Sequence, residues 1–123
     1  MDLGAIPRRR YISRATPVER LRTMGGQLGL NELYIKRDDR LALSGGGNKT
    51  RKLEFLMADA LEQGADTVIT CGGLQSNHCR LTAAAAVREG LSCRLVLVEE
   101  EHQTYDRAAG GNNLLYSLLG VED

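Results

Sequence analysis

The sequence predicts an α/β fold, with an open parallel sheet and flanking helices. Two apolar, strand-like runs at residues 66–71 and 93–98 are separated by a stretch with helical spacing. Strands joined through helices of this length pair in parallel by right-handed crossovers. Two glycine-rich loops lie in strand-to-helix connections, on the side of the sheet where such proteins bind ligands.

The N-terminal part is expected to hold one short helix and one short strand. Thr16-Pro17-Val18-Glu19 has the pattern of a capping box with proline at the first helical position, which predicts a helix ending near Gly25-Gly26. Residues 32–36 have the composition of a short strand leading to an Arg-Asp-Asp sequence. The cluster Arg8-Arg9-Arg10 is interpreted as a solvated chain end, with a phosphate or RNA contact as the alternative.

Helix and strand signals then alternate to the end of the chain. A helix is predicted after the glycines at 45–47, because apolar residues recur at helical spacing and Gly64 supplies a stop; they are Leu53, Leu56, Met57, Ala60 and Leu61. A buried strand at 66–71 is followed by a helix from about Ser76 to Glu89, closed by Gly90. A strand at 93–98 and a helix over about 106–119 complete the pattern.

Composition excludes several classes of partner. The 123 residues contain 16 Lys and Arg and 16 Asp and Glu, so no net charge draws the chain to nucleic acid or membrane. No signal peptide or bilayer-spanning run is present, and the cytoplasm is the expected location. Three cysteines inside predicted elements argue against disulfides, and their spacing matches no common zinc pattern, so no metal is expected.

The first glycine loop places Lys49 directly after Gly45-Gly46-Gly47-Asn48, at the start of a predicted helix. Glycine lets the backbone approach a bound group closely, and a helix N-terminus favours an anion. Lys49 is therefore a phosphate counter-charge, an amine able to attack a carbonyl, or part of a plain solvated loop. A nucleotide-binding G-x-x-x-x-G-K-[ST] loop is excluded, because Leu43 and Asn48 occupy its glycine positions.

The second loop, residues 72–78, follows the first buried strand and opens the next helix. Ser76 and Asn77 are good helix caps, which is the purely structural interpretation. The same position also presents backbone N–H groups and polar side chains to a carboxylate. His78 is either a general acid or base or a structural histidine.

Several ordered motifs together resemble one family. The chain is similar, from about Ile6 to Gly120, to the pyridoxal-phosphate enzymes of the aminocyclopropane-carboxylate (ACC) deaminase and D-cysteine desulfhydrase family. The matching segments are Thr16-Pro17, residues 35–39, 46–56, 75–78 and 111–115. The resemblance implies the smaller domain of a fold-type II enzyme, a pyridoxal 5'-phosphate cofactor, a small amino-acid substrate and a homodimer.

The resemblance also implies roles for individual residues. Lys49 would bind the cofactor covalently and take the substrate α-proton. Ser76 would hold the substrate carboxylate and assist proton movement, and Asn77 would bind the cofactor ring oxygen. Asn48 and Lys52 would reach the phosphate. The segment Lys36-Arg37-Asp38 is expected to be structural, with Arg37 in an ion pair with Asp38 or Asp39.

The implied reaction is β-elimination from D-cysteine, giving pyruvate, ammonia and hydrogen sulfide. His78, counted among the substrate-binding residues, favours this desulfhydrase activity, whereas deaminase-like members tend to carry Gln there. L-cysteate sulfo-lyase and 1-aminocyclopropane-1-carboxylate deaminase are the alternatives. Whether Cys79, beside the predicted site, is reactive stays open.

The resemblance divides the chain into an N-terminal segment at residues 1–43, with a first helix and strand, and a partial α/β cofactor-lysine domain at 44–123. Family members are longer, so the C-terminal catalytic half is expected to be absent. The isolated chain would then bind the cofactor weakly and turn over little. An inactive fragment that serves as a binding or interaction domain is the alternative from another functional class.

Overall fold

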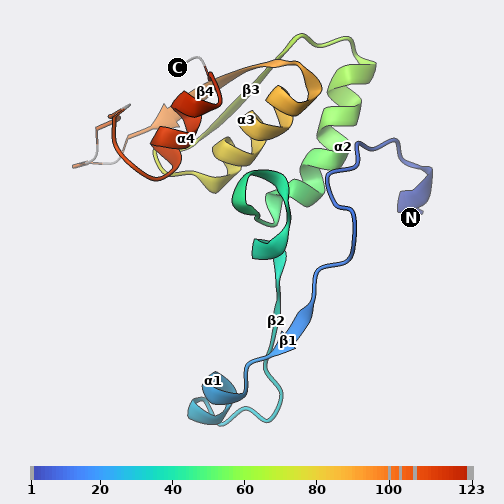
Figure 1. Cartoon of the computed structure of the whole chain (residues 1–123), viewed down its shortest axis with the longest axis vertical. Helices are drawn as coiled ribbons and strands as arrows, with labels where there is room; N and C mark the ends of the chain where they lie inside the picture. Colours follow the sequence, from blue (N-terminus) through green and yellow to red (C-terminus); the bar gives the residue numbers. More distant parts are fainter. Residues whose placement is uncertain (1, 100, 103, 107, 122–123) are drawn as a thin grey trace.

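A body and a narrow arm make up the molecule, as the computed structural model shows (Figure 1). The structure describes residues 2–99, 101–102, 104–106 and 108–121. The body holds α2 (Lys49–Glu62), β3 (Thr67–Gly73), α3 (Asn77–Glu89), β4 (Ser92–Val98) and α4 (Asn112–Leu118). The arm holds β1 (Val18–Arg20), α1 (Arg22–Gln27) and β2 (Tyr34–Lys36). Three short 3-10 helices lie at Leu3–Ala5, Asp38–Arg40 and Leu43–Gly45.

The body has the predicted α/β architecture. β3 and β4 pair in parallel, with a register that runs from Thr67↔Ser92 to Gly73↔Val98. The crossover between them is α3, which begins after the cap residue Ser76 and ends where Gly90 takes a left-handed conformation. Ala83, Ala85 and Ala86 are fully buried, so α3 lies close to the sheet.

The capping-box prediction at Thr16–Glu19 is wrong, because Val18–Arg20 forms a strand and the helix begins only at Arg22. β1 pairs antiparallel with β2, which satisfies its backbone groups across the arm. The Thr16 hydroxyl donates to Asp38 (3.0 Å) instead of capping a helix. Glu19 accepts from Arg37 Nη1 at 2.6 Å, so its carboxylate is also engaged elsewhere.

Two other expectations need correction. The last helix begins at Asn112 rather than near residue 106, after a turn in which Asp106 accepts from Ala108 N and Gly111 has a φ of 71°; position 107 lies outside the described residues. β3, predicted as a buried strand, is half-buried on one face, and Ile69 on the other face is 69% exposed. A single helix layer therefore covers this two-stranded sheet.

The N-terminal segment docks on the body instead of ending as a solvated tail. Glu54 of α2 is 2% exposed, and its Oε1 accepts from the backbone N–H groups of Tyr11 and Ile12, both at 2.8 Å. Arg9 forms an ion pair with Glu89 of α3 at 2.8 Å. Tyr11 enters the core formed by α2 and α3.

The three cysteines are free thiols inside regular elements, as predicted. Cys71 on β3 is exposed, whereas Cys79 on α3 and Cys93 on β4 are buried in a second core with Tyr116 of α4. Among the residues the structure describes, no three His, Cys, Asp or Glu side chains are placed to hold a metal ion. In the same described ranges, no helix has the length and apolarity needed to cross a membrane.

Candidate active site

The glycine loop turns sharply because its three glycines all have positive φ, at 76°, 83° and 136° for Gly45, Gly46 and Gly47. A side chain at Gly46 would overlap the Asp39 carbonyl oxygen. The Gly47 N–H donates to the Asp38 carbonyl oxygen at 2.8 Å. These glycines are therefore required by the backbone itself, because L side chains rarely adopt such conformations.

Arg80 joins the glycine loop to α3. Its Nη2 donates to the Gly46 carbonyl oxygen at 2.9 Å. A Cβ at Gly47 would lie 2.9 Å from Leu81 Cδ1, so the loop also packs directly on α3. The N-termini of α2 and α3 are thereby held side by side.

The first turn of α2 presents three of the predicted residues. Asn48 is the cap residue and makes no side-chain capping bond, and Lys49 and Lys52 follow it on the helix. All three side chains are exposed. An amide and two cations are thus available at the positive end of the α2 dipole.

The second loop is held rigidly by α4. Ser76 Oγ accepts from Cys79 N at 3.3 Å, and the Ser76 carbonyl oxygen accepts from the Tyr116 hydroxyl at 2.9 Å. Asn77 Oδ1 accepts from Asn112 Nδ2 at 3.0 Å. Because its oxygen is engaged, the amide of Asn77 offers its NH2 hydrogens for a further contact.

His78 lies between two threonines and beside the α2 lysines. Its Nε2 is 2.9 Å from Thr70 Oγ1 on β3, and its Nδ1 is 3.4 Å from Thr82 Oγ1 on the same helix. Burial lowers the pKa of His78, and the charges of Lys52 and Lys49 lower this pKa further. A neutral imidazole is therefore favoured at this position.

Predicted residues from both loops line one open cavity of about 710 Å³. Asn48 and Asn77 are among its lining residues, together with the three loop glycines and Arg80. Lys49, Lys52, Ser76 and His78 are not in its wall, although the two lysines act electrostatically on His78. The remaining wall residues belong to the arm and to the segment after it: Glu19, Leu21, Ile35, Lys36, Arg37, Asp38 and Asp39.

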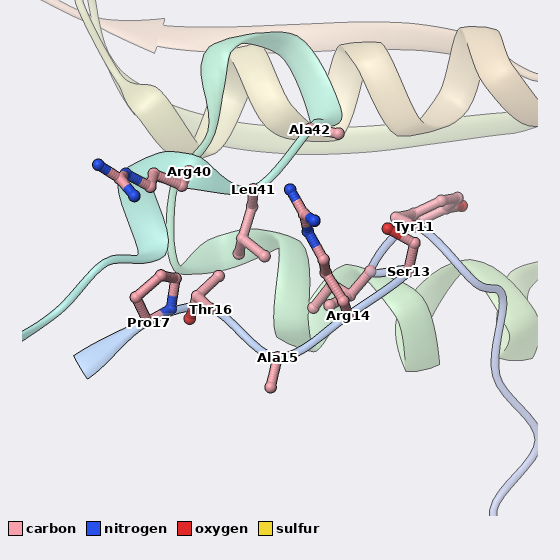
Figure 2. A pocket seen from close by; sticks show the side chains of 10 residues that line it. Tyr11, Ser13, Arg14, Ala15, Thr16, Pro17, Arg40, Leu41 and Ala42 are labelled. Carbon is pink, nitrogen blue, oxygen red and sulfur yellow. The ribbon is translucent and has the colours of Figure 1, made fainter.

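A second hollow, of about 440 Å³, lies between the N-terminal segment and residues 40–42 (Figure 2). Arg14 stands between Leu41 and Tyr11 in this view. None of the predicted site residues lines this hollow. It is therefore separate from the candidate active site.

The ion pair predicted within the Arg-Asp-Asp segment is present. Arg37 forms an ion pair with Asp39 at 2.7 Å. Asp38 pairs instead with Arg51 of α2 at 2.6 Å, and this hydrogen-bonded contact lowers the pKa of Asp38 to about 2. These pairs fix the segment that precedes the glycine loop.

Sequence reasoning missed the residues that support the site from a distance along the chain. Asn112 and Tyr116 hold the Ser76-Asn77 turn, Arg80 holds the glycine loop, and Thr70 contacts His78. The segment 111–115 contributes to the family resemblance, but no local pattern assigns Asn112 to Asn77. Only the packing of α4 on α3 brings them together.

Comparisons with known proteins place the chain among pyridoxal-phosphate-dependent enzymes and their relatives. Three curated proteins named D-cysteine desulfhydrase are 49%, 46% and 47% identical to the chain, from Yersinia enterocolitica, Serratia proteamaculans and Salmonella typhimurium. Each match covers 98% of this chain and 36–37% of the relative, so the chain spans just over a third of their length.

A crystal structure of an ACC deaminase homologue superposes with a TM-score of 0.86 at 42% sequence identity, covering 98% of this chain and 35% of that one. The family model of pyridoxal-phosphate dependent enzymes matches residues 10–122, which is nearly the whole chain. The chain belongs to the pyridoxal-phosphate-dependent enzyme family.

Proposed function

We propose that this chain supplies the cofactor lysine, Lys49, of a pyridoxal-phosphate-dependent lyase that converts D-cysteine to pyruvate, ammonia and hydrogen sulfide. The observation that carries this proposal is the shared cavity. It is lined by Asn48, which precedes Lys49 on one helix, and by Asn77 at the start of another. The name shared by the curated relatives supports D-cysteine as the substrate.

The residues present fit the cofactor. A cavity of about 710 Å³ is within the usual size range of small-molecule sites. A primary amine at Lys49 suits an aldehyde, the NH2 group of Asn77 suits a ring oxygen, and Lys52 at a helix N-terminus suits a phosphate. When bound, pyridoxal phosphate supplies an electron sink for the carbanion formed at the substrate Cα.

The chain's own groups would then bind and move protons. The Lys49 amine would hold the cofactor and, once the substrate amine has displaced it from that bond, the freed amine would take the proton from the substrate Cα. Ser76 Oγ accepts from Cys79 N, so its single hydroxyl hydrogen remains able to donate to the substrate carboxylate. The Asn77 amide is oriented by Asn112, which sets the direction in which it donates.

An absorbance experiment tests the cofactor assignment. Because the chain is expected to bind the cofactor weakly, the protein is mixed with a large excess of pyridoxal phosphate. It should then show a visible band that borohydride bleaches, with the reduced label on the Lys49 peptide. Lys49→Ala should lose the band, and Lys36→Ala, which removes a lysine that does line the cavity, should keep it. A label on another lysine, or an equal band in Lys49→Ala, would overturn the assignment.

The substrate is tested separately by sulfide and pyruvate release from D-cysteine. The ACC deaminase homologue at 42% identity favours a second candidate, deamination of 1-aminocyclopropane-1-carboxylate, and L-cysteate is the third substrate to compare. A higher kcat/KM for either of these would replace D-cysteine in the proposal.

We also propose a cytoplasmic homodimer in which residues 44–123 form the cofactor-lysine unit and residues 1–43 its N-terminal segment. Three free thiols are compatible with a reducing compartment. Sedimentation tests the dimer, and mild proteolysis tests whether cleavage near residue 43 leaves the unit at 44–123 intact.

A further inference from the structure

The hydrogen bonds around His78 assign the position of its ring proton. Thr82 Oγ1 donates to the His78 carbonyl oxygen at 2.9 Å, and a hydroxyl has only one hydrogen to give. Toward His78 Nδ1, at 3.4 Å, the same oxygen therefore acts as an acceptor. A neutral imidazole carries one N–H, so this hydrogen is on Nδ1, and Nε2 is the unprotonated nitrogen.

Thr70 completes the arrangement from the neighbouring strand. Its Oγ1 is 2.9 Å from His78 Nε2, and a bare Nε2 is an acceptor, so the Thr70 hydroxyl donates to it. Thr82 is 4% exposed, and its fixed position on α3 keeps the Nδ1 contact in place. The charges of Lys49 and Lys52 on α2 further disfavour a cationic ring.

We propose that Thr70 and Thr82 are positioning residues that hold His78 as the neutral Nδ1–H tautomer, with its basic Nε2 occupied by the Thr70 hydroxyl. His78 then takes a proton only if the Thr70 contact breaks. In the reaction proposed above, on which this consequence rests, proton transfer is left to Lys49 and Ser76, and His78 is a fixed, neutral neighbour of the α2 lysines.

Nitrogen-15 NMR of the imidazole rings tests the assignment directly. The chain has only two histidines, and His102 is exposed, so His102→Gln identifies the signals of His78. At pH 7.5 the long-range proton–nitrogen pattern of His78 should be that of Nδ1–H, in excess by up to about tenfold, since one hydrogen bond contributes about 0.5–1.5 kcal/mol. His102 should show an averaged pattern.

Variants of the two threonines separate positioning from folding. Thr82→Val should shift His78 toward the Nε2–H tautomer, and Thr82→Ser, which keeps the hydroxyl, should restore Nδ1–H. Thr70→Val should shift the Nε2 signal, whereas Thr70→Ser should not. An Nε2–H or averaged pattern in the unmodified protein would overturn the proposal even if a valine variant failed to fold.

The outcome is independent of the cofactor assignment. An Nδ1–H pattern without a Lys49-dependent absorbance band would leave the tautomer assignment standing and refute the proposed function. The band without the Nδ1–H pattern would do the reverse.

Discussion

At the scale of single residues, two neighbouring glycines of β3 differ in the space available for a side chain. A Cβ at Gly72 would lie 2.6 Å from Ser76 Oγ and 2.8 Å from Cys79 Sγ, whereas a Cβ at Gly73 would meet nothing within 4 Å. No side chain fits at position 72, because the Ser76 turn packs against the strand there. The glycine pair looks uniform in sequence, and only the packing distinguishes its members.

Gly72→Ala should lower the free energy of unfolding by about 1–3 kcal/mol, because the added methyl group forces Ser76 and Cys79 to move. Gly73→Ala is the matched control and should be neutral or stabilising by up to about 1 kcal/mol, since alanine reduces the freedom of the unfolded chain. Urea denaturation measures both changes. Equal destabilisation by the two variants would contradict the packing of Ser76 on Gly72.

The lysines of α2 should control the protonation of His78. Burial is the main cause of its lowered pKa, and the Lys52 charge is next. Lys52→Gln should therefore raise the pKa of His78, and Lys52→Arg, which keeps the charge, should leave it nearly unchanged. NMR titration of the ring measures the pKa.

The same shift has a consequence for stability. Because its pKa is lower in the folded state, His78 binds fewer protons there than in the unfolded chain. Its contribution to the free energy of unfolding is therefore fully present above about pH 6.5. That contribution is lost as the pH falls from about 6.5 toward the folded pKa.

For the Lys52 prediction, an unchanged pKa of His78 in Lys52→Gln would show that Lys52 does not act on the ring.

At the scale of elements, α4 supports the Ser76-Asn77 turn. Asn112 Nδ2 donates to the Gln75 carbonyl oxygen at 2.7 Å and to Asn77 Oδ1, while the adjacent Asn113 donates to the Asp106 carbonyl oxygen at 3.2 Å. The two asparagines are both buried, yet only the first contacts the candidate site.

Asn112→Ala should cost about 1–3 kcal/mol of stability, because buried groups lose their partners. It should also speed amide hydrogen exchange at residues 75–77. Asn113→Ala should destabilise the protein without this local effect on exchange. Similar exchange at 75–77 in both variants would mean that α4 does not hold the turn.

Elements whose signals are local are predicted well from the sequence. The boundaries of β3, α3 and β4 agree with prediction to within two residues, since Ser76 and Gly90 act within their own turns. The Thr16 box fails because Thr16 and Glu19 bind Asp38 and Arg37, about twenty residues away. Sequence patterns describe neighbours along the chain, and these partners are distant.

The candidate site divides in the same way. Lys49, Ser76, Asn77 and His78 belong to two short motifs and are recognised by the resemblance. Residues that orient them come from other elements, and a single sequence has no pattern that pairs Thr70 with His78 across a strand-to-helix turn. Motifs therefore predict the candidate site residues, and the structure adds the residues that contact and orient them.

At the scale of the whole molecule, Glu54 joins the N-terminal segment to the body. This buried carboxylate accepts two backbone N–H groups, and Arg8 lies 3.7 Å from its other oxygen. The Arg9 backbone N–H also donates to the Glu54 carbonyl oxygen at 2.7 Å. One side chain of α2 thus fixes where the segment lies.

Glu54→Ala should release residues 8–12, because their N–H groups lose a buried acceptor and gain water instead. Trypsin should then cleave after Arg8, Arg9 and Arg10 at least about tenfold faster. This change corresponds to a loss of roughly 1.4 kcal/mol in the free energy that holds the segment on the body. Glu62→Ala, on the exposed end of α2, is the control and should cleave as the unmodified protein does. Equal cleavage of the two variants would contradict the docking role.

The three thiols lie at different depths of the β3–α3–β4 unit and should therefore react on different time scales. Cys71 is exposed, whereas Cys79 and Cys93 are 0% and 5% exposed. Burial raises the pKa of the Cys79 thiol, and it raises the pKa of the Cys93 thiol to about 11. An alkylating reagent should modify Cys71 at once and the other two only when α3 lifts from the sheet. The rate at which mass spectrometry detects the second and third alkyl groups would then measure the opening of the β3–α3–β4 unit, with no introduced probe. Modification of Cys79 as fast as Cys71 would refute the packing of α3 on the sheet.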